Sequence, residues 1–253
     1  MREPILVFIA PLLVAAPVLR AQSSLPAASS EIDVAYGRYF NTPGTYTTSD
    51  GNGDNNRGSA SLDGFFVSPT LTAAGSSDLQ GNYINSGGTA KYSYYAEIVP
   101  INGYVGAVPS TMLIDVGASL AIASTAPTTA VADSFLDLSQ GAYVVDRWHL
   151  ASDSATPFSL NVNATETVQV NANFQMAFMV QAGGGTDFNS ASANISGVTL
   201  AIDPSVLNAQ DFQLIYSAAV TPVPEPSACC AVLGAAALGV ACVRRRRNPA
   251  KLG

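Results

Sequence analysis

The sequence predicts an all-β fold, an antiparallel β-sandwich or jelly-roll-like domain, and two observations carry this prediction. Apolar residues occur in short runs that are rich in β-branched and aromatic residues and are separated by clusters of Gly, Asn, Ser and Pro. Several runs also alternate apolar and polar residues, which gives a strand one buried face and one solvated face. The clearest alternation is VQVNANFQMAF at 168–178.

Strands are expected wherever such a run lies between turn-forming clusters. The expected strands are 32–40, 62–67, 90–99, 111–123, 142–150, 158–162, 167–180, 195–202 and 211–220. The Ala-rich stretch 120–132 is not expected to be a helix, because Pro127 interrupts it. A single all-β exported domain is therefore expected over 31–217, with a flexible leader at 22–30 before it and a linker at 218–227 after it.

Charge is scarce and unevenly distributed along the chain. Charged residues make up 11% of the sequence, against roughly 25% in an ordinary soluble domain. Between residues 22 and 221 there are four basic residues and sixteen acidic ones, a formal charge of −12. A domain this acidic repels phosphate backbones, so nucleic acid is excluded as a partner.

The cysteines do not contribute to the expected domain. All three, Cys229, Cys230 and Cys242, lie in the C-terminal apolar run. The domain therefore contains no disulfide and no cysteine-based metal site, and its own core must hold it together.

The N-terminus has the layout of a secretory signal peptide at 1–21. Arg2 is followed by an apolar stretch at 5–19 and then by small residues, with cleavage expected after Ala21. The alternative is a buried N-terminal helix of the domain. Prolines within the apolar stretch disfavour that helix, so we expect a signal helix that engages the export machinery.

The C-terminus combines three features in a fixed order. Pro224, Glu225 and Pro226 precede an uncharged stretch at 228–243, and the cluster Arg244, Arg245, Arg246 and Arg247 follows directly. A helix over 228–243 is about 24 Å long, which is short for a ~30 Å hydrocarbon layer but can span it where the bilayer thins. Arginines beside an apolar span stay on the cytoplasmic side, so we expect a short transmembrane helix, a basic cytoplasmic tail at 244–253 and a domain that faces outward.

This C-terminal order resembles the PEP-CTERM sorting signal of bacterial exported proteins. The resemblance covers only about the last 30 residues. It implies that Pro224, Glu225 and Pro226 form the sorting motif and that Arg244, Arg245, Arg246 and Arg247 act as the stop-transfer cluster. It also implies recognition by an exosortase, a membrane-embedded cysteine protease that removes the tail. A plain membrane anchor remains the alternative, whereas a GPI-type signal fits less well because its apolar tail does not end in a basic cluster.

No cofactor is predicted, although one loop has part of a calcium-binding pattern. Asp50, Asn52 and Asp54 place side-chain oxygens at alternate positions, as the first half of a calcium loop does. Asn55 stands where such a loop needs Gly, and Ser61 where it needs a bidentate Glu. A polar turn-rich loop is therefore the preferred interpretation.

Residues suited to catalysis are few. His149 is the only histidine, and no nucleophile motif accompanies it, so an ordinary strand histidine is preferred over a catalytic base. The many acids provide carboxylate pairs of the kind a glycosidase needs, but most sit beside Gly, Ser or Asn as solvated turn residues do. Trp148 is the speculative glycan contact, since it could form a sugar-stacking platform together with nearby tyrosines; core packing is the competing role. Those tyrosines are Tyr92, Tyr94, Tyr95, Tyr104 and Tyr143.

The function expected from the sequence is that of an exported structural protein without catalytic activity. It would pass transiently through the inner membrane, anchored by its C-terminal helix, and reach the cell surface or extracellular matrix. The expected partners are the export machinery and an exosortase-type membrane protease, with extracellular polysaccharide as a further candidate. The alternatives are a lectin-like carbohydrate-binding module and, ranked below it, a secreted glycan hydrolase.

Overall fold

The fold is all-β, as predicted, and consists of two antiparallel sheets. The computed structural model describes residues 25–34, 38–49, 57–76, 86–125, 130–152, 158–184 and 189–221. The strands are β1 (Ser29–Val34), β2 (Arg38–Phe40), β3 (Gly44–Ser49), β4 (Arg57–Leu62), β5 (Leu71–Ser76), β6 (Ser86–Pro100), β7 (Thr111–Ser124), β8 (Val131–Gln140), β9 (Tyr143–Ala151), β10 (Phe158–Gln169), β11 (Phe174–Gly184), β12 (Ser190–Ile202) and β13 (Phe212–Tyr216), with a short 3₁₀ helix η1 (Ala209–Asp211).

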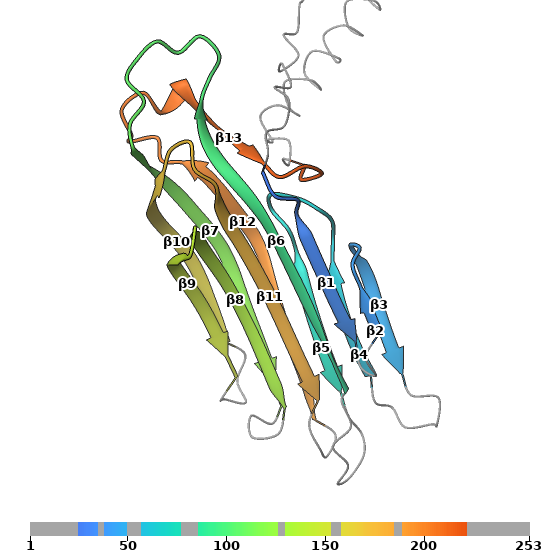
Figure 1. Ribbon diagram of the computed structural model, residues 1–253. Coiled ribbons are helices and arrows are strands. Elements are labelled where there is room, and N and C mark those ends of the chain that lie inside the picture. Colours follow the sequence, from blue (N-terminus) through green and yellow to red (C-terminus); the bar gives the residue numbers. More distant parts are fainter. Residues whose placement is uncertain are drawn as a thin grey trace, which may run out of the picture.

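The two sheets lie face to face as a β-sandwich (Figure 1). In the first, sheet A, the order is β2-β1-β6-β11-β8-β9, and β13 also pairs with β6. In the second, sheet B, the order is β10-β7-β12-β5-β4-β3. Strands β9 and β10 lie at the same end of the sandwich and contact one another, although they belong to different sheets.

Period-two alternation decides which side chains enter the core. In β7, every second residue from Met112 to Ser124 is buried, and the residues between them point away from the partner sheet. Strand β11 shows the same pattern and buries Phe174, Met176, Phe178 and Val180. Each buried Val, Leu, Ile, Phe or Met side chain contributes ~1.5–3 kcal/mol, so these two central strands supply much of the stabilising apolar burial.

Polar groups inside the sandwich join the two layers. Ser134 of β8 is fully buried, and its hydroxyl lies 3.3 Å from the carbonyl oxygens of Ala121 and Asn194 in the opposite sheet. Tyr92 and Tyr94 of β6 point inward beside Phe178, with ring centroids 5.7–5.9 Å apart. Their hydroxyls reach the connection between β4 and β5, so the core is bound to this loop as well as to the facing sheet.

Glycines bring the sheets close together where β4 meets β6. A Cβ added to Gly88 would overlap the carbonyl oxygen of Ser59, and one added to Gly58 would overlap the carbonyl oxygen of Gly87. Only glycine allows so close an approach of two backbones. This end of the sandwich is therefore thinner than the ~10 Å usual for packed sheets.

The strand boundaries differ from the expected ones in several places. The expected strand 32–40 is two strands, β1 and β2, which pair with each other. The expected strand 62–67 overlaps β4 (Arg57–Leu62) only at Leu62. The expected strand 167–180 is two strands, β10 and β11, because the chain turns between them with Asn171 in a left-handed conformation (φ 57°). Strands β3, β5 and β8 were not predicted; the first two are rich in Gly, Ala, Ser and Thr and lack the apolar signal that the prediction used. The expected strand 211–220 is limited to Phe212–Tyr216, with a turn after it.

The folded domain extends beyond both of its expected limits. Strand β1 begins at Ser29, inside the stretch expected as leader. At the other end, the Thr221 N–H donates to the carbonyl oxygen of Phe65 (2.9 Å), and the Val67 N–H donates to the carbonyl oxygen of Thr221 (3.3 Å). Val220 is buried, so the stretch 218–221, expected as linker, belongs to the domain. Within the described ranges, no helix is long and apolar enough to cross a bilayer.

Candidate functional site

The outer face of sheet A carries most of the charged side chains whose positions are described. Its ion pairs join Lys91 to Glu31 (2.8 Å), Arg147 to Asp137 (2.6 Å) and His149 to Asp133 (3.7 Å). In the second pair, two guanidinium nitrogens of Arg147 donate to the two carboxylate oxygens of Asp137, and this hydrogen bonding raises the pKa of Arg147. The basic partners are about half exposed, and ion pairs at exposed sites contribute little to stability, although the Asp137 side chain is only 13% exposed.

The outer face of sheet B has a different chemistry. On strands β5, β7, β10 and β12 its side chains are mostly Ser, Thr, Asn and Ala. Asp115 is the only ionisable side chain that these four strands direct to this face, and it accepts a 2.9 Å hydrogen bond from the Thr165 hydroxyl. The two outer faces therefore present different surfaces to a partner, one with ion pairs and one nearly uncharged.

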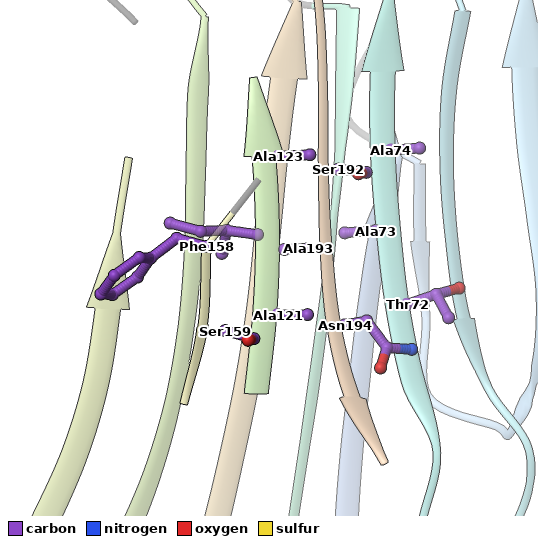
Figure 2. A pocket seen from close by; sticks show the side chains of 11 residues that line it. Thr72, Ala73, Ala74, Ala121, Ala123, Phe158, Ser159, Ser192, Ala193 and Asn194 are labelled. Carbon is purple, nitrogen blue, oxygen red and sulfur yellow. The ribbon is translucent and has the colours of Figure 1, made fainter. Parts of the chain in front are cut away.

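A shallow hollow of about 410 Å³ lies on this second face (Figure 2). It is lined by Thr72, Ala73, Ala74, Ala121, Ile122, Ala123, Phe158, Ser159, Ser192, Ala193 and Asn194. Figure 2 shows Phe158 at one margin and Thr72 at the other, with small side chains between them. The Asn194 amide already donates to the Leu71 carbonyl oxygen (3.3 Å), so the hydroxyls of Ser159 and Ser192 are the polar groups best placed to meet a ligand.

Trp148 is half-buried on the inner side of β9. In the β8–β9 register it stands opposite Leu136, which is fully buried, so both side chains lie on the same face of sheet A. Its ring packs against the core. The tyrosines expected beside it are dispersed: Tyr92 and Tyr94 are core residues, whereas Tyr143 is 79% exposed at the start of β9.

His149 lies on the opposite face of β9 from Trp148. Its ring meets Phe135 edge-on at 6.4 Å, and its Nε2 is 3.7 Å from a carboxylate oxygen of Asp133. The ring is about half exposed. These contacts are those of a surface histidine that packs against a neighbouring strand.

Two acids that the sequence analysis did not single out lie, partly exposed, on the inner faces of the two edge strands β9 and β10. Asp146 of β9 stands opposite Leu138, and Glu166 of β10 stands opposite Ile114; both apolar partners are fully buried. The pKa of Glu166 is raised by burial, by the charge of Asp146 and by a hydrogen bond to Asp146. The alternation of β10 contains the signal for this position, because Glu166 falls in phase with the buried Val162 and Val168.

The remaining predicted residues lie outside the described part of the chain. They are the sorting motif Pro224, Glu225 and Pro226, the cluster Arg244, Arg245, Arg246 and Arg247, and the loop residues Asp50, Asn52 and Asp54. In the part that is described, no group of three or more His, Cys, Asp or Glu side chains is arranged to hold a metal ion.

Comparison with known proteins does not assign the chain to a family. No protein-family model matches the chain, and no curated protein sequence matches it significantly.

Proposed function

We propose that this chain is an exported, non-catalytic protein whose β-sandwich serves as a structural component of the cell surface or extracellular matrix. The observation that carries the proposal is the C-terminal order of Pro224-Glu225-Pro226, an uncharged stretch at 228–243 and four arginines from Arg244 to Arg247. In this proposal the signal peptide at 1–21 engages the export machinery. An exosortase-type protease then acts at the sorting motif while the helix at 228–243 holds the chain in the membrane.

The position where the domain ends supports this proposal. Thr221 is hydrogen-bonded to Phe65 and Val67, and Pro224 follows almost at once in the sequence. At ~3.3 Å per extended residue, the sorting motif would start about 10 Å from the domain. Proline lacks an N–H donor and favours extended backbone before it, so this short segment would stay extended and accessible to a protease at the membrane surface.

The strand order supports classing the domain as jelly-roll-like. From β5 to β12, the strands β5, β12, β7 and β10 form one four-stranded layer and β6, β11, β8 and β9 form the other. Eight antiparallel strands with this alternation between two layers correspond to two interlocking Greek keys. Such a fold serves many unrelated functions, so it does not identify a ligand.

The sorting motif can be tested by replacing Pro224, Glu225 and Pro226 together with alanine in a host that possesses an exosortase. The measurements are apparent mass and membrane partition. Export should remain intact, while an uncleaved, membrane-bound form accumulates. Pro222→Ala is the matched control, because it alters the same segment outside the motif and should be processed like the parent. Release of the triple variant at the parent's size and rate would mean that the tail is only an anchor.

Carbohydrate binding is the second candidate function, and the hollow on the outer face of sheet B favours it. An uncharged surface with hydroxyl groups and one aromatic margin suits a neutral sugar chain. A glycan array on the purified domain tests this candidate, with Ser192→Arg filling the hollow and Ser93→Arg, on the outer face of sheet A, as the control. Trp148→Ala is less informative, because the half-buried ring also supports the fold. Binding that survives Ser192→Arg would exclude the hollow.

A further inference from the structure

The end of the sandwich where β9 meets β10 is an unusual place for two acids. Each strand is the last of its sheet, and the two strands contact one another across the layers (Figure 1). Most of the other inward side chains here are apolar, among them Trp148, Leu150, Val162 and Val168. We call the contact between the inner sides of β9 and β10 the seam.

Register places both carboxyl groups in the seam. Asp146 shares the inner face of sheet A with Trp148, and Glu166 shares the inner face of sheet B with Val168. Asp146 is in phase with Trp148 and Leu150, and the β8–β9 register becomes irregular only beyond it, between Leu138 and Ser139. Burial, followed by the nearby charge of Asp146, raises the pKa of Glu166. A hydrogen bond between two carboxyl groups requires a proton on one of them, because two ionised carboxylates cannot donate to one another.

No positive charge on the neighbouring strands faces the pair. The inward side chains of β7 and β8 are Met112, Ile114, Val116, Ala118, Leu120, Ile122, Ser124, Ala132, Ser134, Leu136, Leu138 and Gln140, none of them ionisable. Tyr143, at the start of β9 and in register with Gln140, is the other titratable group on the inner faces of β9 and β10. The Arg147 backbone N–H binds an Asp146 carboxylate oxygen (2.7 Å), but its guanidinium is held by Asp137 on the outer face. Asp133 and His149 also lie on the outer face of sheet A, and Asp115 on that of sheet B.

We propose that Asp146 and Glu166 form a proton-dependent clasp that closes the β9–β10 seam. With one proton between them, one carboxyl group donates to the other and the two edge strands are held together. When that proton is released to water, two negative charges face each other in a partly desolvated place, and their repulsion separates the strands.

The direction of the pH effect follows from the acid's titration. Folding raises the pKa of Glu166 above its ordinary value of 4.5, so the folded chain binds this proton more tightly than the unfolded chain does. The stabilisation by the clasp is therefore complete below the ordinary pKa of Glu166, and it is lost as the pH rises through the raised pKa that Glu166 has in the folded chain. The seam should loosen toward higher pH, while the rest of the sandwich stays folded.

Trp148, the only tryptophan of the chain, reports on the seam directly because it lies next to Asp146 along the inner face of β9. The experiment follows tryptophan emission and acrylamide quenching of the full chain in mild detergent between about pH 4 and pH 8. We expect a red shift and stronger quenching as the pH rises. Hydrogen exchange should accelerate in β9 and β10 over the same range and stay unchanged in the central strand β11.

Two variants and one control decide the outcome. Glu166→Gln and Asp146→Asn each keep a side chain that can donate to the partner but remove one carboxyl group, so tryptophan emission should become independent of pH. Asp115→Asn, on the outer face of the adjacent strand, should titrate like the parent. Far-UV circular dichroism checks that each variant is folded.

Three results would overturn the proposal. The first is tryptophan emission that does not change with pH in the parent. The two acids would then be fixed, inward-pointing charges that keep the edge strands from pairing with other chains. The second is an unchanged transition in Glu166→Gln. The third is a seam that is open at every pH without calcium and closes at high pH only when millimolar calcium is added. A cation, and not a proton, would then join the two carboxylates.

Discussion

The Tyr94 hydroxyl donates a 3.0 Å hydrogen bond to the carbonyl oxygen of Val67 inside the sandwich. It links the central strand β6 to the connection between β4 and β5. Both residues are buried, so water cannot replace either partner without entering the core. A buried carbonyl without a donor costs about 1–3 kcal/mol.

Tyr94→Phe should therefore lower the free energy of unfolding by about 1–3 kcal/mol, because it leaves the Val67 carbonyl unsatisfied at almost unchanged side-chain volume. Tyr92→Phe is the matched variant: its hydroxyl makes a longer bond, 3.2 Å to the Phe66 carbonyl oxygen, at a less buried site. Urea unfolding of the domain compares the two. If Tyr92→Phe cost as much as Tyr94→Phe, burial of the acceptor would not be the deciding factor.

Gly88→Ala should force β4 and β6 apart, because the new Cβ would overlap the Ser59 carbonyl oxygen of the facing backbone. The expected loss is about 3 kcal/mol, the upper range for overpacking a core. Gly141→Ala provides the comparison. Gly141 has a positive φ of 62° but open space around its Cβ position, so only backbone strain of about 1 kcal/mol is expected. Equal losses in denaturant unfolding would show that the sheets can separate freely at Gly88.

A fragment that ends at Thr221 should be clearly more stable than one that ends at Tyr216. The shorter fragment loses the buried Val220 and the hydrogen bonds between Ser217 and Tyr95, of which the Ser217 N–H makes one at 2.9 Å. Loss of the valine alone costs about 1.5–3 kcal/mol. A third fragment that ends at Ser227 should match the one that ends at Thr221. If all three unfold at the same denaturant concentration, the chain after β13 does not belong to the domain.

Alkaline conditions should destabilise the core through its tyrosines. Burial raises the pKa of Tyr216 to about 12, and burial raises the pKa of Tyr94 as well, with Tyr216 and Tyr92 adding to the shift. The folded chain holds these protons more tightly than the unfolded chain, so stability is complete below the ordinary pKa of 10 and falls as the pH rises above it. An absorbance titration should show a class of tyrosines that ionises together with unfolding. In Tyr216→Phe the fall in stability with pH should be shallower; an unchanged slope would contradict a contribution from this residue.

The fold class could be predicted because alternation is a local property. In β11, Phe174, Met176 and Phe178 alternate with Gln175 and Ala177, and the strand buries the side that this pattern indicates. Strands β3 and β5 could not be found in this way, since Ser, Thr, Gly and Ala carry little apolar signal. The backbone N–H and C=O groups of β3 and β5 bond to neighbouring strands. The stabilisation from this pairing does not depend on the hydrophobicity of their side chains.

The features of the candidate sites also fall into two groups, those set by consecutive residues and those set by tertiary packing. The sequence by itself determined the alternation, the acidic charge of the domain and the order of features at the C-terminus, because each is a property of consecutive residues. Only the tertiary structure decided that Trp148 and Asp146 point into the seam, that Glu166 meets Asp146 and that His149 lies on the opposite face. Those relationships depend on register and on which edge strands end side by side, and both are set by packing between segments distant in the chain.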